Sequence, residues 1–271
     1  MTVYISDSFL GFQRFQLDQQ SSPMSGAFRA IMSGEAHTIW SQSLPLKKAA
    51  EFLRSKLELV PNGSTVVAHG KAGLDLIECL IQYPETQAKV GRLICLQTPV
   101  WGTPVADFLT GQPLARLIIN GICKFKKLSI EAIEELTELN RQVYMILNRT
   151  KIQKLLSEIE VITVGSSFVW QQKPQNWKER VVLFFNQLIA KHSGPHDGMV
   201  PERSTRIANE SHLQLTDVTH LGSVKISEDL VELNEEIQTQ LGAKLSGPSG
   251  YPHLSLLARP AERNAEELIR L

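Results

Sequence analysis

The chain has 271 residues, a length that suits one α/β domain carrying an insertion. Hydrophobic residues make up 42% of it, which is enough to bury a sizeable core. Its 28 basic and 28 acidic side chains cancel, so the overall charge gives no reason to expect nucleic acid or a strongly anionic membrane surface as partner.

The sequence contains three cysteines, Cys79, Cys95 and Cys123, and no Cys-x-x-Cys motif. Because Cys79 and Cys95 lie in apolar runs, we expect buried thiols rather than metal ligands or disulfides. The N-terminal stretch MTVYISDSFLGF lacks a basic segment followed by a long apolar one, and no run approaches about 18 apolar residues. We therefore expect no transmembrane helix, no cofactor and a cytoplasmic protein, or a secreted one if a leader has been removed.

The first part of the chain alternates short apolar runs with segments of helical periodicity. The apolar runs predict strands at 3–5, 37–40, 64–69 and 90–96. Apolar residues at helical spacing predict helices at 27–32, 45–57 and 71–81. Such an alternation is typical of an α/β fold with a mostly parallel central sheet flanked by helices.

The middle of the chain interrupts this alternation, because 105–156 is helical almost throughout and predicts a lid or cap inserted into the framework. Its apolar stripes fit a lid face over a lipid site and an ordinary helix–sheet interface equally well. Further elements are predicted as strands at 161–164 and 212–215 and helices at 177–190, 227–241 and 260–271. We predict a single domain over 1–271 with a helical C-terminal extension over 226–271.

The informative junction is the sequence VVAHGKAGLDL at 66–76, where a buried strand runs directly into a helix. α/β-Hydrolases place the nucleophile of a G-x-S-x-G elbow at such a turn. Here the five positions read Ala68-His69-Gly70-Lys71-Ala72, so Gly70 stands where the serine is expected. A phosphate loop begins similarly, but the spacing G-x-x-x-x-G-K-[ST] is absent, which disfavours a nucleotide-binding protein.

Three further segments follow in order. The stretch LQTPVWGTPVAD at 96–107 resembles the T-P-H-R-G-[ST]-x-x-A-D motif of bacterial triacylglycerol lipases. The sequence HDGMVP at 196–201 resembles the N-D-G-x-V-P motif of that family, and DVTHL at 217–221 resembles its D-H-L segment. Before the elbow, FLGF at 9–12 resembles the family's oxyanion loop. The resemblance covers about 3–225 and implies the α/β-hydrolase fold.

The resemblance also implies roles for individual residues. Asp197 corresponds to the acid and His220 to the base of a catalytic triad, in the chain order of the hydrolase fold. Phe9 and Lys71 correspond to the residues whose backbone N–H groups bind the oxyanion. Gly70 corresponds to the nucleophile, and glycine has no group that could attack a carbonyl.

Other positions also depart from the lipase pattern. Asp7 and Ser8 replace a His-Gly pair beside the oxyanion hole, and Val100 replaces the histidine of T-P-H. Gly222 and Ile226 stand where lipases supply calcium ligands, so we expect no metal there.

These departures favour a lipase-like homologue that is non-catalytic or very weakly active and binds a lipid, an acyl ester or a protein. The alternative is an active carboxylic-ester hydrolase. It would be either the Ser→Gly form of a true lipase or an enzyme with a non-standard nucleophile, such as Ser8 or a water activated by His220.

Overall fold

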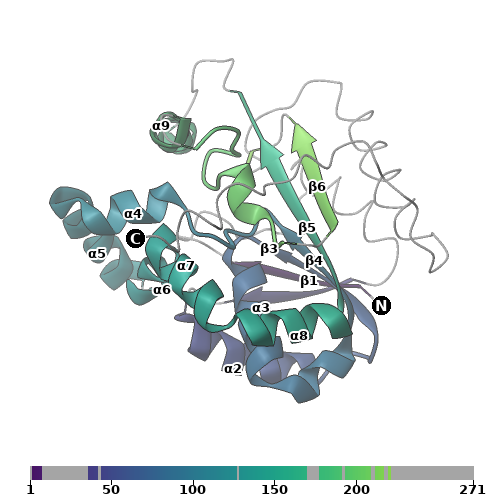
Figure 1. Ribbon diagram of the computed structural model, residues 1–271. Helices are drawn as coiled ribbons and strands as arrows, with labels where there is room; N and C mark the ends of the chain where they lie inside the picture. Colours follow the sequence, from purple (N-terminus) through teal and green to yellow (C-terminus); the bar gives the residue numbers. More distant parts are fainter. Residues whose placement is uncertain are drawn as a thin grey trace.

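The computed structural model describes residues 2–7, 36–41, 44–126, 128–169, 177–190, 193–208, 211–216 and 219–220. Within these residues, six strands form one parallel sheet in the order β2-β1-β3-β4-β5-β6 (Figure 1). The strands are β1 (Thr2–Asp7), β2 (Ala36–Ser41), β3 (Ser64–His69), β4 (Val90–Leu96), β5 (Glu160–Ser167) and β6 (Ser211–Thr216). Because the strands are parallel, their carboxyl ends meet at one edge, where open α/β sheets bind ligands.

One face of the sheet is covered by three helices, which lie below the strands in Figure 1. They are α2 (Leu46–Leu57), α3 (Lys71–Gln82) and α8 (Arg149–Glu158). The central strands β3 and β4 are buried along most of their length, which explains why their sequences are continuous apolar runs rather than alternating ones. Helix α3 is buried over nearly its whole length because it packs between the sheet and its neighbours α2 and α8.

Four helices between β4 and α8 gather to the left of the sheet in Figure 1, and we call them the cap. They are α4 (Pro104–Gly111), α5 (Pro113–Lys126), α6 (Glu131–Glu134) and α7 (Glu138–Leu147). Hydrogen bonds tie the cap to the covering layer, because Glu135 accepts from the Leu46 N–H at 2.7 Å and Tyr144 donates to Glu78. Helix α8 contacts α3 and β5 instead, so it belongs to the layer on the sheet.

Three elements complete the described part of the chain: η2 (Pro84–Lys89), α9 (Trp177–Ala190) and η3 (Glu202–Thr205). The predicted fold class is confirmed, and so is every predicted strand. The predicted helices at 45–57, 71–81 and 177–190 are also confirmed, and 105–156 is occupied by α4 to α8. The helices expected at 27–32, 227–241 and 260–271, and with them the extension over 226–271, lie outside the described residues.

All three cysteines are free and buried, and burial was predicted for Cys79 and Cys95. Burial raises the pKa of the Cys79 and Cys95 thiols to about 12, which keeps both protonated and unreactive at neutral pH. Among the helices that the structure describes, none is long and apolar enough to cross a membrane.

Candidate active site

Gly70 forms the turn between β3 and α3 at the carboxyl edge of the sheet. Its backbone has φ 59° and ψ −133°, a conformation that residues with a side chain rarely adopt. The Gly70 N–H donates to the Leu96 carbonyl at 2.9 Å, and the Gly70 carbonyl accepts from the Gly73 N–H at 3.2 Å. The turn is therefore anchored on β4 and on α3, and its strand–turn–helix geometry is that of a nucleophile elbow.

The first turn of α3 approaches the loop after β4 very closely. A Cβ atom added at Gly73 would lie 2.2 Å from Oγ1 and 2.8 Å from Cγ2 of the buried Thr98. Any other residue at this position would force the Thr98 side chain to shift, and no motif in the sequence pointed to Gly73. The elbow thus depends on glycine at two positions for two different reasons.

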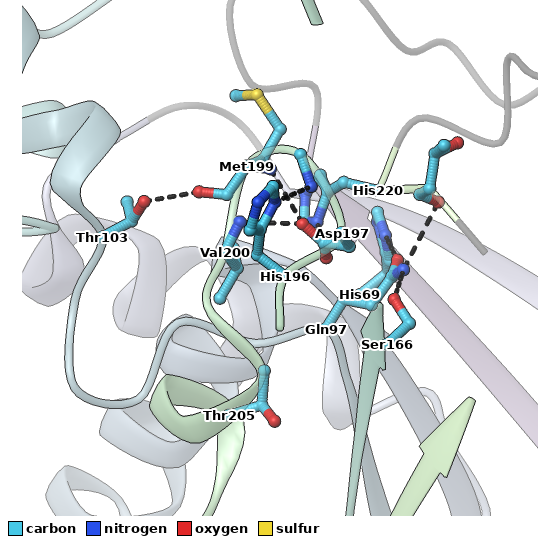
Figure 2. A network of polar contacts seen from close by, with 12 residues as sticks. His69, Gln97, Thr103, Ser166, His196, Asp197, Met199, Val200, Thr205 and His220 are labelled. Carbon is cyan, nitrogen blue, oxygen red and sulfur yellow. Dashed lines mark hydrogen bonds and ion pairs between the residues drawn. The ribbon is translucent and has the colours of Figure 1, made fainter. Parts of the chain in front are cut away.

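Asp197 and His220 form a buried pair, drawn in Figure 2. The His220 Nδ1 atom lies 2.9 Å from Oδ2 of Asp197, and the His220 N–H donates to the Asp197 carbonyl at 2.9 Å. The other carboxyl oxygen, Oδ1, accepts from the N–H groups of Met199 at 2.9 Å and Val200 at 2.7 Å. These contacts fix the carboxyl group, which in turn orients the imidazole, as in an acid–histidine pair of a hydrolase.

The structure brings this pair to the elbow. A Cβ atom built on Gly70 would lie 3.4 Å from Nε2 and 3.6 Å from Cε1 of His220. A hydroxyl on that carbon would therefore lie within hydrogen-bonding reach of Nε2, the arrangement that activates a serine nucleophile. Gly70, Asp197 and His220 are separated by long stretches of sequence but meet in the order and geometry of a triad that lacks its hydroxyl.

His69, the residue before Gly70, packs on His220 with 4.8 Å between the ring centroids. Burial, and after it the charge of His220, lowers the pKa of His69 to about 3, so this imidazole is neutral over the physiological range. Its Nε2 atom lies 2.9 Å from Oε1 of Gln97. His69 therefore lines the site beside the base, His220, and is not itself a second base.

Gln97 was not identified as a site residue from the sequence, yet it connects β3 and β5 to the segment that carries His220 (Figure 2). Besides His69 it contacts the Ser166 hydroxyl, and its Nε2 atom donates to the Thr219 carbonyl at 3.3 Å, one residue before His220. Gln97 is fully buried and has φ 50°, which is unusual for a residue other than glycine. The only signal in the sequence was a polar residue at the end of a buried strand.

The Lys71 side chain has a structural role. It forms a buried ion pair with Asp75, and its Nζ atom donates to the Leu44 carbonyl at 2.7 Å. Val100, where the lipase motif has histidine, is fully buried and its carbonyl accepts from Nε of Arg141 at 3.1 Å. Ser6 pairs with His69 in the register of β1 and β3, so Asp7, the next residue, follows at the edge that carries Gly70.

Several predicted positions lie outside the described residues: Phe9, Ser8, Gly222 and Ile226. Their predicted roles, including the oxyanion N–H of Phe9, stay predictions. Among the described histidines, cysteines and carboxylates, no group of three or more is placed to hold a metal ion.

No protein-family model matches the chain, and no curated protein resembles it in sequence. Its fold does resemble solved structures. The mature form of a lipase from Bacillus licheniformis superposes with a TM-score of 0.65 at 15% identity, over 87% of this chain and 91% of that one. A metagenomic carboxyl esterase superposes with a TM-score of 0.60 at 15% identity, over 90% of this chain and 75% of that one. The Staphylococcus hyicus lipase superposes with a TM-score of 0.53 at 11% identity, over 90% of this chain and 95% of that one.

The chain therefore has the α/β-hydrolase fold, and bacterial lipases and esterases are among the structures that share it. At these low identities the likeness establishes the fold. The activity has to be argued from the residues at the site.

Proposed function

We propose that this chain is a lipase- or esterase-like homologue that lacks the nucleophile and binds a lipid or acyl ester without forming an acyl-enzyme. The observation that carries the proposal is Gly70 itself, at the elbow and facing Nε2 of His220. Without a hydroxyl at this position the covalent route of serine hydrolases is closed.

The rest of the site supports binding. Nε2 of His220 lies 3.4 Å from the place where a Cβ at position 70 would stand, and the Asp197 carboxyl group orients the His220 ring. We assign to the backbone N–H groups of Lys71 and Phe9 the binding of the ester carbonyl oxygen, in the manner of an oxyanion hole. The cap helix α4 contributes buried apolar residues, such as Val105 and Leu109, and we propose on this basis that an acyl chain is a better ligand than a charged group.

The test is the Gly70→Ser variant, assayed with p-nitrophenyl esters of increasing chain length. We expect background rates for the unmodified chain and measurable turnover for Gly70→Ser, because the new Oγ lies within reach of Nε2 of His220. Gly70→Ala is the matched control, since it places a Cβ in the same backbone conformation without a hydroxyl. The double variant Gly70→Ser, His220→Ala should return to background.

The rate that Gly70→Ser reaches is informative. A low rate of ester hydrolysis by Gly70→Ser would agree with a site that has also changed at Asp7 and Val100. A rate equal to that of an ordinary lipase would identify the chain as the Ser→Gly form of a complete enzyme. Turnover at ordinary rates by the unmodified chain would overturn the proposal. Binding is measured separately, by calorimetry of the unmodified chain with the short-chain ester that it leaves intact.

One observation favours a second function, ester hydrolysis by water. The Asp197–His220 pair is fully assembled although no serine requires it. In this route His220 removes a proton from water while the oxygen bonds to the ester carbon. The C–O bond to the alcohol then breaks, and the alcohol leaves with the proton that His220 returns.

A fluorophosphonate probe separates the remaining routes. Labelling at Ser8 that is lost in Ser8→Ala would indicate a relocated nucleophile. Turnover without labelling, abolished in His220→Gln, would indicate the water route. Neither labelling nor turnover is expected for a binding protein.

A further inference from the structure

Glu202 is a buried carboxylate close to the candidate site in the sequence, but the proposed function gives it no role. It begins the short helix η3, and its side chain is only 9% exposed. Its Oε1 atom accepts from Nε and Nη2 of Arg206, at 2.9 and 2.6 Å, and lies 2.8 Å from Nε2 of His212. Burial opposes ionisation of Glu202, but the hydrogen bonds from His212 and Arg206 outweigh it and lower the pKa of the carboxyl group. One buried oxygen thus collects the contacts of two side chains.

The other ring nitrogen of His212 extends these contacts to the sheet. His212 lies in β6, and its Nδ1 atom is 2.8 Å from the Thr163 hydroxyl of β5. The line Glu202–His212–Thr163 has the order of a catalytic triad: carboxylate, imidazole and hydroxyl. Thr163 is fully buried, however, so its hydroxyl is closed to a substrate. The line therefore fastens η3 to two neighbouring strands and performs no chemistry of its own.

The side chains of this line pack directly on Gly165 of β5. A Cβ atom built on Gly165 would lie 2.6 Å from Oγ1 of Thr205. The same atom would lie 3.1 Å from Cγ of Glu202 and 3.2 Å from Cε1 of His212. A larger residue in β5 would push these side chains away from the strand, so glycine at this position leaves room for the contact between Glu202 and His212.

The segment that Glu202 fastens is the acid turn, by which we mean residues 195–202. The Glu202 N–H donates to the Pro195 carbonyl at 2.9 Å, so the two ends of the turn are joined. Inside the turn, the Asp197 N–H donates to the Val200 carbonyl at 3.2 Å. Because the turn is closed on itself, a shift of Glu202 at its base would carry Asp197 with it.

We propose that Glu202 is a positioning residue: through His212 it holds the acid turn against β5 and β6, and so places the Asp197 carboxyl group at the His220 ring. This inference deepens the proposed function and rests on it for the importance of the Asp197–His220 pair. The contacts themselves exist in the unmodified chain and require no hydroxyl at Gly70.

The acid turn is also held on its other side, at the loop after β4. The Thr103 hydroxyl donates to the Met199 carbonyl (Figure 2), and the Ser204 hydroxyl donates to the Gly102 carbonyl. If these contacts alone supported the turn, Asp197 would keep its place without Glu202. The test has to separate the two supports.

The test is the NMR resonance of the Nδ1 proton of His220, recorded on the full chain. Since Oδ2 of Asp197 accepts at 2.9 Å, this proton is bonded to a carboxyl group and should resonate downfield of the backbone amides. His220→Gln assigns the resonance by removing it. In Glu202→Ala, exchange of this proton with solvent should become about tenfold faster or more, because hydrogen bonds to a charged group are lost from the base of the turn.

Two further variants test whether Glu202 acts through hydrogen bonds. Glu202→Gln is the conservative variant, and its carbonyl oxygen still accepts from His212 and Arg206, so the exchange rate should stay close to that of the unmodified chain. His212→Ala leaves the contact between Glu202 and Arg206 in place but cuts the link to the strands. It should also accelerate exchange, and it keeps the proposal testable if Glu202→Ala fails to fold.

Leu57→Ala is the control for a general loss of stability. Leu57 is fully buried in α2, a helix that packs on α3 and β2. Its replacement leaves a cavity there, so it should lower the urea midpoint. The exchange rate of the His220 proton should not change.

Three results would overturn the proposal. The first is an unchanged His220 resonance in Glu202→Ala and His212→Ala, which would assign the support of the turn to the loop after β4. The second is acceleration by Glu202→Gln as large as that by Glu202→Ala. The third is equal acceleration by Leu57→Ala and Glu202→Ala. The measurement needs neither ligand nor turnover, so its outcome is independent of the Gly70→Ser assay that tests the proposed function.

Discussion

The two halves of the candidate site are constructed differently. The Asp197–His220 half is held by buried side-chain and backbone hydrogen bonds, several of which converge on one carboxyl group. The elbow half is held by backbone geometry, because β3, Gly70 and α3 form the turn without any side chain at its centre. Loss of the hydroxyl therefore leaves the shape of the site intact, while loss of the acid would not. The following predictions test this difference, beginning with the largest expected effect.

The pH dependence of the free energy of unfolding should reveal the lowered pKa of His69, the histidine that packs on His220 next to Gly70. His69 titrates near pH 6.5 in the unfolded chain, but its pKa in the folded chain is about 3. Between these values the unfolded state binds more protons, so the free energy of unfolding falls as the pH is lowered, by up to about 1.4 kcal/mol per pH unit. Urea unfolding at a series of pH values should show this slope, and His69→Gln should flatten it. An unchanged slope in the variant would contradict the burial of a neutral His69.

Removal of the acid should be costly for the hydrogen-bonded half. Asp197→Ala leaves the N–H groups of Met199 and Val200 and the His220 ring without their acceptor, at a position that is fully buried. We expect a loss of about 3 kcal/mol in the free energy of unfolding, measured in urea. Asp197→Asn should lose less, because its carbonyl oxygen still accepts from the backbone. Equal losses would mean that the carboxyl group does not organise the loop.

Crowding at the elbow should lower the free energy of unfolding by less than removal of the acid does. Gly73→Ala places a methyl group against the Thr98 side chain, and we expect a loss of about 2 kcal/mol from overpacking. The double variant Gly73→Ala, Thr98→Ala should regain part of it, because the nearest atoms, Oγ1 and Cγ2, are then absent. Thermal unfolding of the single and double variants measures the coupling, and strictly additive losses would contradict the close approach.

The smallest effect is expected at the turn itself. Gly70→Ala strains a backbone at φ 59°, but the new Cβ meets His220 at an ordinary contact distance of 3.4 Å. We expect a loss of about 1 kcal/mol, from the backbone alone. The same urea measurement checks it, and a loss as large as that of Asp197→Ala would show that the elbow cannot hold any side chain.

Local periodicity predicted the strands and helices of the described residues well, because the apolar spacing of a helix or strand depends only on residues close together in the chain. It also placed Gly70 at a strand–helix junction. The pairing of Asp197 with His220 was implied by the resemblance to lipases and not by periodicity, and the two side chains do lie in contact. Gln97 was missed because its role consists of contacts to His69 at the end of β3, Ser166 in β5 and Thr219 after β6, three segments far from it in sequence. No local pattern distinguishes such a residue from any other polar residue after a strand.

The cap helices show the same limit of prediction from local sequence. The apolar stripes of the 105–156 segment were evident in the sequence, but periodicity does not say which stripe faces the core. On α5 both sides are apolar, and only the packing of Ile119 and Cys123 against the core leaves Leu117 and Phe125 in solvent. The balanced net charge likewise concealed a helix with three basic residues and no acidic one.

The sequence by itself thus determined the order of the elements, the α/β class and the absence of a hydroxyl at position 70, since each depends on residues close together in the chain. The tertiary structure alone decided that the Gly70 position meets Nε2 of His220 and that α5 turns an apolar face outward. The first is a contact between segments far apart in sequence, and the second follows from which side of α5 packs against the core, so only the packing of the sheet, its covering helices and the cap sets them.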